Sequence, residues 1–248
     1  MDTPTLNPAA TRDTPATAGA GRVDLYAGIH KALRLMMART LTQVGATDPA
    51  AADEVTAALD RVGRLLALCE LHLHDENAFV HPALERARPG SAARIAAEHV
   101  HHVEAIADLR DLAGLVADSG SAARAAALGR LYRALAVFVA DNFHHMQVEE
   151  TAHNAVLWAA YGDAELMAIE QAIVASIPPD AMAEALHWFI PALHAGERAA
   201  MLDGMRREMP PEPFANVLEI ARTTLDADAH ARLLRALGLP VAPGLMTA

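Results

Sequence analysis

The same spaced pair occurs twice in the chain, as His72-Leu-His-Asp-Glu76 and as His145-Met-Gln-Val-Glu149. A histidine four residues before a glutamate shares one face of an α-helix with it, one turn apart. Both pairs lie in long stretches whose apolar residues recur with helical periodicity. Imidazole and carboxylate groups that converge in this way are ligands of non-haem metal ions. The two pairs therefore predict two helices that meet at a metal centre.

Outward from these pairs, glycine, proline and serine clusters divide residues 23–162 into four long predicted helices. Long helices joined by short turns pack as antiparallel neighbours. The sequence therefore predicts an all-α fold with an up-down-up-down four-helix bundle. The breaks between and after the helices are Gly45 to Pro49, where Asp48 is the expected N-cap, Pro89 to Ser91, Ser119 to Ser121, and Gly162.

The flanking segments have a different composition. Residues 1–22 are rich in Thr, Ala, Pro and Gly, which predicts a disordered N-terminal tail. Residues 163–248 are divided by prolines into runs of ordinary helix length. We expect four or five short helices there, packed as an extension on the bundle.

The other two predicted helices also supply candidate ligands. His99 and His102 share a stripe with apolar residues of the third helix, and His30 is the histidine of the first. Unpaired polar groups in a bundle core are costly, which favours metal ligation for histidines that gather there. His102 is the open case, because a structural role explains its position equally well.

The heights of these residues along the bundle test the same prediction. Ligands on antiparallel helices meet at one level only if the connecting turn lies midway between them. The midpoint of Glu76 and His99 falls at about residue 87, and that of His99 and His145 at about residue 122, both beside predicted turns. His30 and His72 centre on about residue 51, several residues beyond the predicted break. Two of the three hairpins therefore fit.

Composition excludes several classes of protein. The 248-residue chain has a net charge of −11 and no basic stripe, which argues against a nucleic-acid partner. No run of about 18 apolar residues predicts a membrane span, and a cytoplasmic location is expected. Cys69 is the single cysteine, so a thiolate-rich zinc or iron–sulfur site is excluded.

These motifs resemble those of the hemerythrin-like, or HHE cation-binding, proteins over roughly residues 25–160. The resemblance implies a di-iron centre with one bridging carboxylate from the second helix and another from the fourth. Hemerythrins proper place two histidines four apart on the third helix, whereas position 103 here is valine and the nearest second histidine is His102. Hemerythrins proper also end with a histidine and an aspartate five apart, whereas this chain has His145 and Glu149. The segments that carry the resemblance are His30-Lys31 with Arg34, His72-x3-Glu76 with Phe79 and His81-Pro82-Ala-Leu-Glu, Glu98-His99, and His145-x3-Glu149-Glu150.

Several functions and metals remain open from the sequence. The first hypothesis is a di-iron protein that binds O2 or a related small molecule as carrier, store or sensor. The second is an enzyme that uses the same centre on peroxide, NO or an organic substrate with O2, and the third is an iron-handling or structural metal-binding protein. Two iron ions are the expected cofactor, with manganese or zinc as alternatives. The predicted ligands are His30, His72, Glu76, His99, His102, His145 and Glu149.

Overall fold

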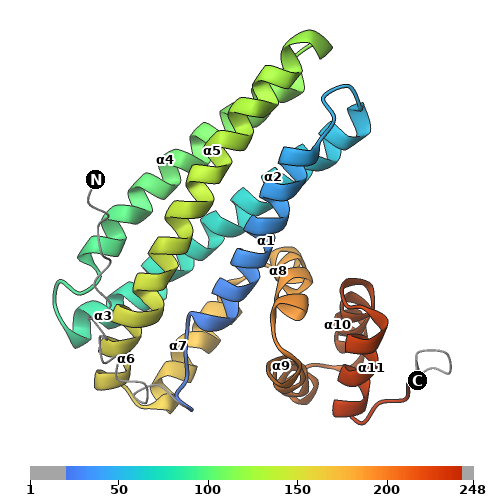
Figure 1. The fold of residues 1–248 in the computed structure, drawn as a ribbon. Coiled ribbons are helices and arrows are strands. Elements are labelled where there is room, and N and C mark those ends of the chain that lie inside the picture. Colours follow the sequence, from blue (N-terminus) through green and yellow to red (C-terminus); the bar gives the residue numbers. More distant parts are fainter. Residues whose placement is uncertain (1–20, 242–248) are drawn as a thin grey trace, which may run out of the picture.

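The computed structural model describes residues 21–241, and every regular element in that range is a helix (Figure 1). The predicted all-α fold is therefore confirmed. Each of the four longest helices packs against two of the others: α1 and α4 both contact α2 and α5. Together the four enclose a common core. They are α1 (Ala27–Ala46), α2 (Ala52–Asp75), α4 (Ala93–Asp118) and α5 (Ser121–Val148).

Two of the long helices each continue through a π-helical turn of their own. α2 runs through η1 (Glu76–Val80) into α3 (His81–Ala87), and α5 runs through η2 (Glu149–His153) into α6 (Asn154–Ala160). A π turn hydrogen-bonds residues five apart and is often found at functional sites. The glutamates of the two His-x3-Glu motifs are the first residues of the two π turns.

The core of the bundle is aliphatic. Val62, Leu65 and Leu66 of α2 and Leu131 and Leu135 of α5 are almost fully buried, at helical spacings of three and four residues. Burying each such side chain contributes about 1.5 to 3 kcal/mol. This apolar stretch occupies the part of the bundle beyond the histidines and holds the four helices at a fixed separation.

The first connection differs in detail from its prediction. α1 ends at Ala46 and α2 begins at Ala52, so the break extends to Ala51. Asp48 does not cap α2, because its carboxylate accepts a hydrogen bond from the Ala50 N–H at 2.8 Å and closes a local turn. The longer connection brings the turn close to the midpoint between His30 and His72, which the predicted break had missed.

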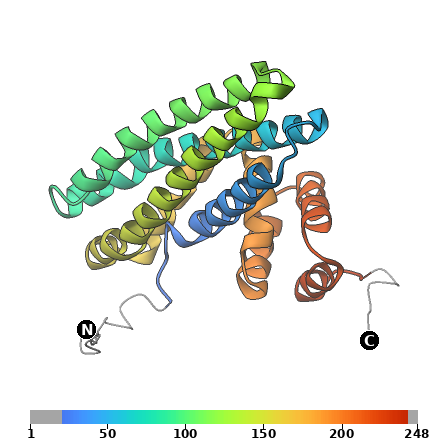
Figure 2. The same ribbon diagram turned by 45° about the horizontal axis from the view of Figure 1, so that its top comes forward.

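Five shorter helices follow the bundle. α8 lies across α1 (Figure 2), and its Ala185 and Trp188 join the bundle core. The two helices approach closely at Gly28 of α1, where a Cβ would lie 3.2 Å from the Phe189 ring. The helices are α7 (Asp163–Ser176), α8 (Pro179–Ala192), α9 (Ala195–Glu208), α10 (Pro211–Thr224) and α11 (Ala227–Ala236).

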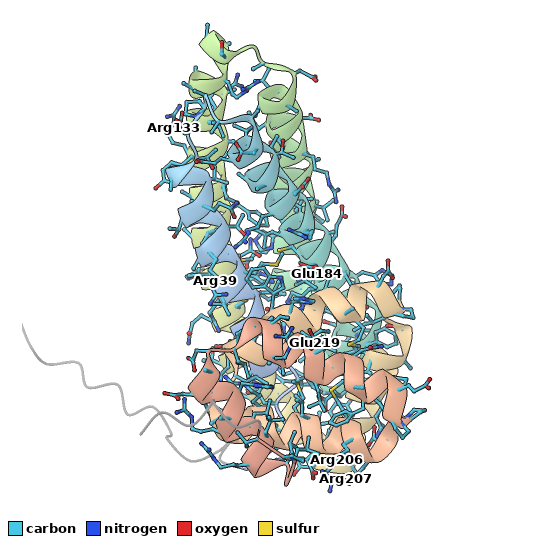
Figure 3. The ribbon with its side chains drawn as sticks, turned by 90° about the vertical axis from the view of Figure 1, so that its right-hand side faces the viewer. Arg39, Arg133, Glu184, Arg206, Arg207 and Glu219 are labelled. Carbon is cyan, nitrogen blue, oxygen red and sulfur yellow. The ribbon has the colours of Figure 1, made fainter. Side chains whose placement is uncertain are left out.

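α8 to α11 share a second apolar cluster that includes Ile190, Leu202 and Phe214. Their outer surface is charged: Figure 3 views this side, with Glu219 on α10 and Arg206 on α9. The cluster therefore gives the C-terminal helices their own core, while α8 attaches them to α1.

The structure describes only part of the predicted N-terminal tail and of the predicted C-terminal extension. Residues 1–20 of the predicted tail, and residues 242–248, lie outside the described range. Arg22, which the prediction had included in the tail, donates hydrogen bonds to the carboxylate of Asp163 and to the Tyr161 carbonyl, both at 2.7 Å. Among the helices of residues 21–241, none is both long enough and apolar enough to cross a bilayer.

Candidate metal centre

Six of the seven predicted site residues come together between the four long helices. The side chains approach from every helix at one level, and five of the six residues are almost fully buried, while the His72 side chain is 10% exposed. The six are His30 on α1, His72 on α2, Glu76 at the start of η1, His99 on α4, His145 on α5 and Glu149 at the start of η2.

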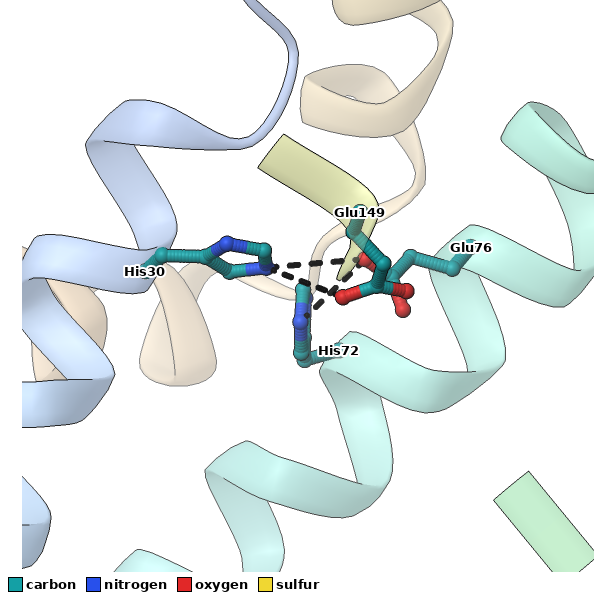
Figure 4. Close-up of side chains that lie close together, drawn as sticks. All are labelled: His30, His72, Glu76 and Glu149. Atoms are coloured by element: carbon teal, nitrogen blue, oxygen red, sulfur yellow. Dashed lines mark ion pairs between the residues drawn. The ribbon is translucent and has the colours of Figure 1, made fainter. Parts of the chain in front are cut away.

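Four of these residues form a first group of possible metal donors (Figure 4). The Nε2 atom of His30 lies 3.4 Å from Oε2 of Glu149 and 3.8 Å from Oε1 of Glu76. The Nε2 atom of His72 lies 3.3 Å from the same Glu76 oxygen. Two imidazole nitrogens and two carboxylate oxygens thus surround one point.

A second group uses the same two glutamates with the other two histidines. The Nε2 atom of His99 lies 3.3 Å from Oε2 of Glu76 and 3.8 Å from Oε1 of Glu149. The Nε2 atom of His145 lies 3.3 Å from that Glu149 oxygen. Each glutamate therefore offers one oxygen to each group, which is how a carboxylate bridges two metal ions.

Most of the donor atoms have no other polar partner in the described part of the chain; the exceptions are the Nε2 atoms of His99 and His145, which lie 3.1 Å from each other. Within residues 21–241, all four oxygens of Glu76 and Glu149 and the Nε2 atoms of His30 and His72 are buried without a hydrogen-bond partner. A buried polar atom without a partner costs about 1 to 3 kcal/mol. Ligands each about 2.1 Å from one ion lie roughly 3 to 3.4 Å apart, close to the separations in both groups.

Hydrogen bonds on the outer side orient three of the imidazoles. An Nδ1–H that donates to an oxygen leaves the Nε2 lone pair facing the centre, which is the tautomer that a metal ion requires. Sequence reasoning had not assigned these supporting roles. The pairs are His30 with Glu150 at 3.0 Å, His145 with Glu98 at 2.9 Å, and His99 with Asn77 at 2.9 Å.

Without metal, the carboxylates favour protonation of His30 and His99, whereas burial lowers the pKa of His72 to about 4. Burial opposes a charge on His30, but its hydrogen bond to Glu150 and the nearby carboxylates of Glu76 and Glu149 outweigh burial and raise the pKa of His30 to about 9. His99 is raised to a pKa of about 9 in the same way, with Glu149 and Glu76 outweighing burial. A metal ion that binds must therefore displace protons from these two histidines.

His102 is the predicted site residue that lies outside both groups. It is buried, and its ring meets the His145 ring edge to face with centroids 4.6 Å apart. Burial lowers its pKa to about 4. Three residues of α-helix turn it about 60° from the direction of His99, which directs it toward the core beside the centre.

The π turns bring in a histidine that sequence reasoning missed. The backbone N–H of His81 donates to the Glu76 carbonyl, so His81 stands one π turn after that glutamate. On an α-helix, five residues would have turned it about 140° away. Instead its ring stacks on His99 with centroids 4.9 Å apart. Pro82, which cannot donate the next backbone hydrogen bond, was the available signal for an irregular turn.

His153, at the end of η2, lies beside His81. One donor atom from each, with one from Glu149, forms a third group within 4.8 Å. The Nδ1 atom of His153 is 3.0 Å from the Tyr26 hydroxyl oxygen. Three other bundle histidines, His74, His101 and His144, are exposed and face away from the centre.

Comparison with known proteins gives one match. The family model described as the hemerythrin HHE cation binding domain matches residues 22–153. That range contains all six convergent residues and His102, and it ends at His153. No curated protein and no solved structure matches the chain.

Proposed function

The chain belongs to the hemerythrin HHE cation-binding domain family, and on that premise we propose that it holds two iron ions and binds O2 or a related small molecule at them. The first ion takes His30 and His72, and the second takes His99 and His145. The proposal treats the four long helices as the up-down-up-down bundle predicted from the turns.

The observation that carries this proposal is the division of the carboxylate oxygens. Oε1 of Glu76 and Oε2 of Glu149 face the first pair of histidines, while their other oxygens face the second pair. Bridging carboxylates hold two ions about 3.5 to 4 Å apart. A single ion would leave half of these buried oxygens without a partner.

The choice of iron follows from the donors and the reaction. Imidazole and carboxylate without thiolate suit iron, manganese and zinc alike. A pair of ferrous ions supplies the electrons and the open coordination positions that O2 needs. The protein's own contribution is to hold the imidazoles in the correct tautomer, through partners such as Glu150 and Glu98, and to keep water away by burial.

A second candidate function is peroxide breakdown, favoured by the position of His102. With His102 outside both groups, four side chains would hold each ion, and a position that a further histidine could have filled would stay open. Such an open position would suit a substrate that binds and leaves as product better than a molecule that is only carried. His81, whose Nε2 atom is buried without a partner among the described residues, is positioned to hydrogen-bond such a substrate.

The test uses the iron-loaded, anaerobically reduced protein mixed with O2 in a stopped-flow spectrometer. Reversible binding predicts an absorption band that persists and disappears when O2 is removed. Turnover predicts a transient band, and peroxide consumption that exceeds the number of sites. The absence of any spectral change with O2, peroxide or NO would contradict both functions and leave an iron-handling or structural role.

A further inference from the structure

His81 and His153 lie between the six-residue metal centre and the solvent. They stand just after η1 and at the end of η2, and their rings meet edge to face with centroids 5.9 Å apart. One donor atom from each, together with an oxygen of Glu149, falls within 4.8 Å of the others. This third group therefore shares Glu149 with both groups of the centre.

One member of this group, His153, lines an open cavity of about 730 Å³. His153 forms part of its wall, although only 2% of the residue is exposed. A donor atom of the same imidazole lies within 4.8 Å of a Glu149 oxygen, so His153 connects the cavity wall to the metal centre. The rest of the wall is mostly small, including Ala87, Gly90, Ser91, Ala152 and Ala155.

The chemistry of the third group points to a cation. Two imidazoles and a carboxylate are donors for a divalent metal ion, whereas a small neutral molecule needs no such set to pass. The Nε2 atom of His81 is buried and has no hydrogen-bond partner within the described part of the chain. Arg88 also lines the cavity, but it is exposed at the rim, where solvent and salt screen its charge.

We propose that His81, His153 and Glu149 form a transit site at which a divalent metal ion is held briefly on its way from the cavity into the two-metal centre. The proposal rests on the proposed function, since it needs a centre to be filled.

Two features make this a site of passage and not of residence. Both oxygens of Glu149 already face the two groups of the centre, so a third ion on Glu149 would be repelled by a filled pair. The Nδ1 atom of His153 is hydrogen-bonded to Tyr26, and a resident ion on that atom would break the bond. An ion is therefore held weakly here and passes to the stronger site.

The experiment measures Co²⁺ loading of the metal-free full chain by visible absorption, and release from the loaded protein by excess EDTA. The variants are His81→Gln and His153→Gln, which keep side-chain size and hydrogen bonding, and the matched control is His144→Ala on the surface. We expect both variants to load at least about tenfold more slowly and to release more slowly by the same factor. The final content should stay at two ions per chain, because a transit site changes rates without changing the equilibrium.

The outcomes are distinct. Parent-like loading in both variants would overturn the transit site. Loss of bound ions, or faster release, would also overturn it, because His81 or His153 would then be a permanent ligand. If the parent itself binds fewer than two ions, the proposed function fails independently of the route.

A variant of the cavity wall keeps the proposal testable if a glutamine variant does not fold. Ala155→Trp leaves every donor atom in place and narrows the cavity from an exposed position. It should slow loading and release together, with the two-ion content unchanged. Parent-like rates in this variant would contradict the cavity as the route.

Discussion

At the scale of single residues, His30 and His99 each face carboxylates. When no metal ion is bound, these carboxylates stabilise a proton on each of the two imidazoles. Their pKa values of about 9 in the metal-free protein mean that both are protonated at neutral pH. The Nδ1–H of His30 stays on Glu150 when metal binds, so the proton that leaves is the one on Nε2.

Metal binding at pH 7 is therefore predicted to release protons, about one each from His30 and His99. The sign follows from competition: raising the pH toward 9 removes the protons, so apparent affinity should increase up to that pH and then level off. Titration calorimetry in buffers of different ionisation enthalpy measures the number released. Equal apparent affinity at pH 6.5 and pH 8.5 would contradict the raised pKa values.

His102 gives the second residue-scale prediction. Because it lies outside both donor groups, His102→Ala should keep two ions per chain, while His99→Ala should lose at least one of them. His102→Ala should still change the rate of reaction with O2 or peroxide, since its ring packs against His145. Metal analysis and stopped-flow absorption check both parts. Equal metal loss in the two variants would make His102 a ligand.

At the scale of elements, α2 and α5 contribute to the centre in parallel ways. Each carries a His-x3-Glu pair, and in each the glutamate begins a π turn. The π turn allows the helix to place one more histidine on the inner face before ordinary packing resumes, with His81 after η1 and His153 at the end of η2.

The parallel roles of the two helices predict matched effects of Glu76→Ala and Glu149→Ala. Each removes one oxygen from both groups, so each should reduce the content below one ion per chain. His74→Ala and His144→Ala are the controls, because both histidines are exposed and each precedes one of the glutamates by a few residues. Both control variants should retain two ions. Similar losses in all four variants would mean that the inward faces of the helices are wrongly assigned.

Helical periodicity was sufficient to predict the four helices, because an error of a residue or two at a turn leaves the inner face unchanged. It also placed His72 with Glu76, since both lie on the regular part of α2 or at its end. It could not place His81, because the π turn depends on packing that no spacing rule contains. It could not decide on His102, because periodicity gives the direction of a side chain and not its distance from a metal ion.

At the scale of the whole molecule, the C-terminal helices support the bundle without contributing to the centre. Trp188 of α8 is buried in the bundle core, its indole N–H donates to Glu184, and Arg61 of α2 lies 5.7 Å from its ring. None of the three donor groups found within residues 21–241 includes a residue after His153. A substitution in the C-terminal helices should therefore lower the free energy of unfolding without removing metal ions from the centre.

Trp188→Ala is predicted to lower the free energy of unfolding by about 3 to 5 kcal/mol, the usual cost of truncating a buried tryptophan. The metal content should remain two ions per chain. Val174→Ala on α7 is the matched control, because its side chain is 52% exposed and its loss should change stability little. Chemical denaturation and metal analysis test the separation, and loss of metal from folded Trp188→Ala would contradict it.

The pair of ions bridged by Glu76 and Glu149 is the central claim, and anomalous diffraction at the iron edge from crystals of the iron-loaded protein tests it most directly. The predicted result is two peaks about 3.5 to 4 Å apart, each in contact with one oxygen of both glutamates, with His30 and His72 at one peak and His99 and His145 at the other. A single peak, or a second peak away from these carboxylates, would contradict the account.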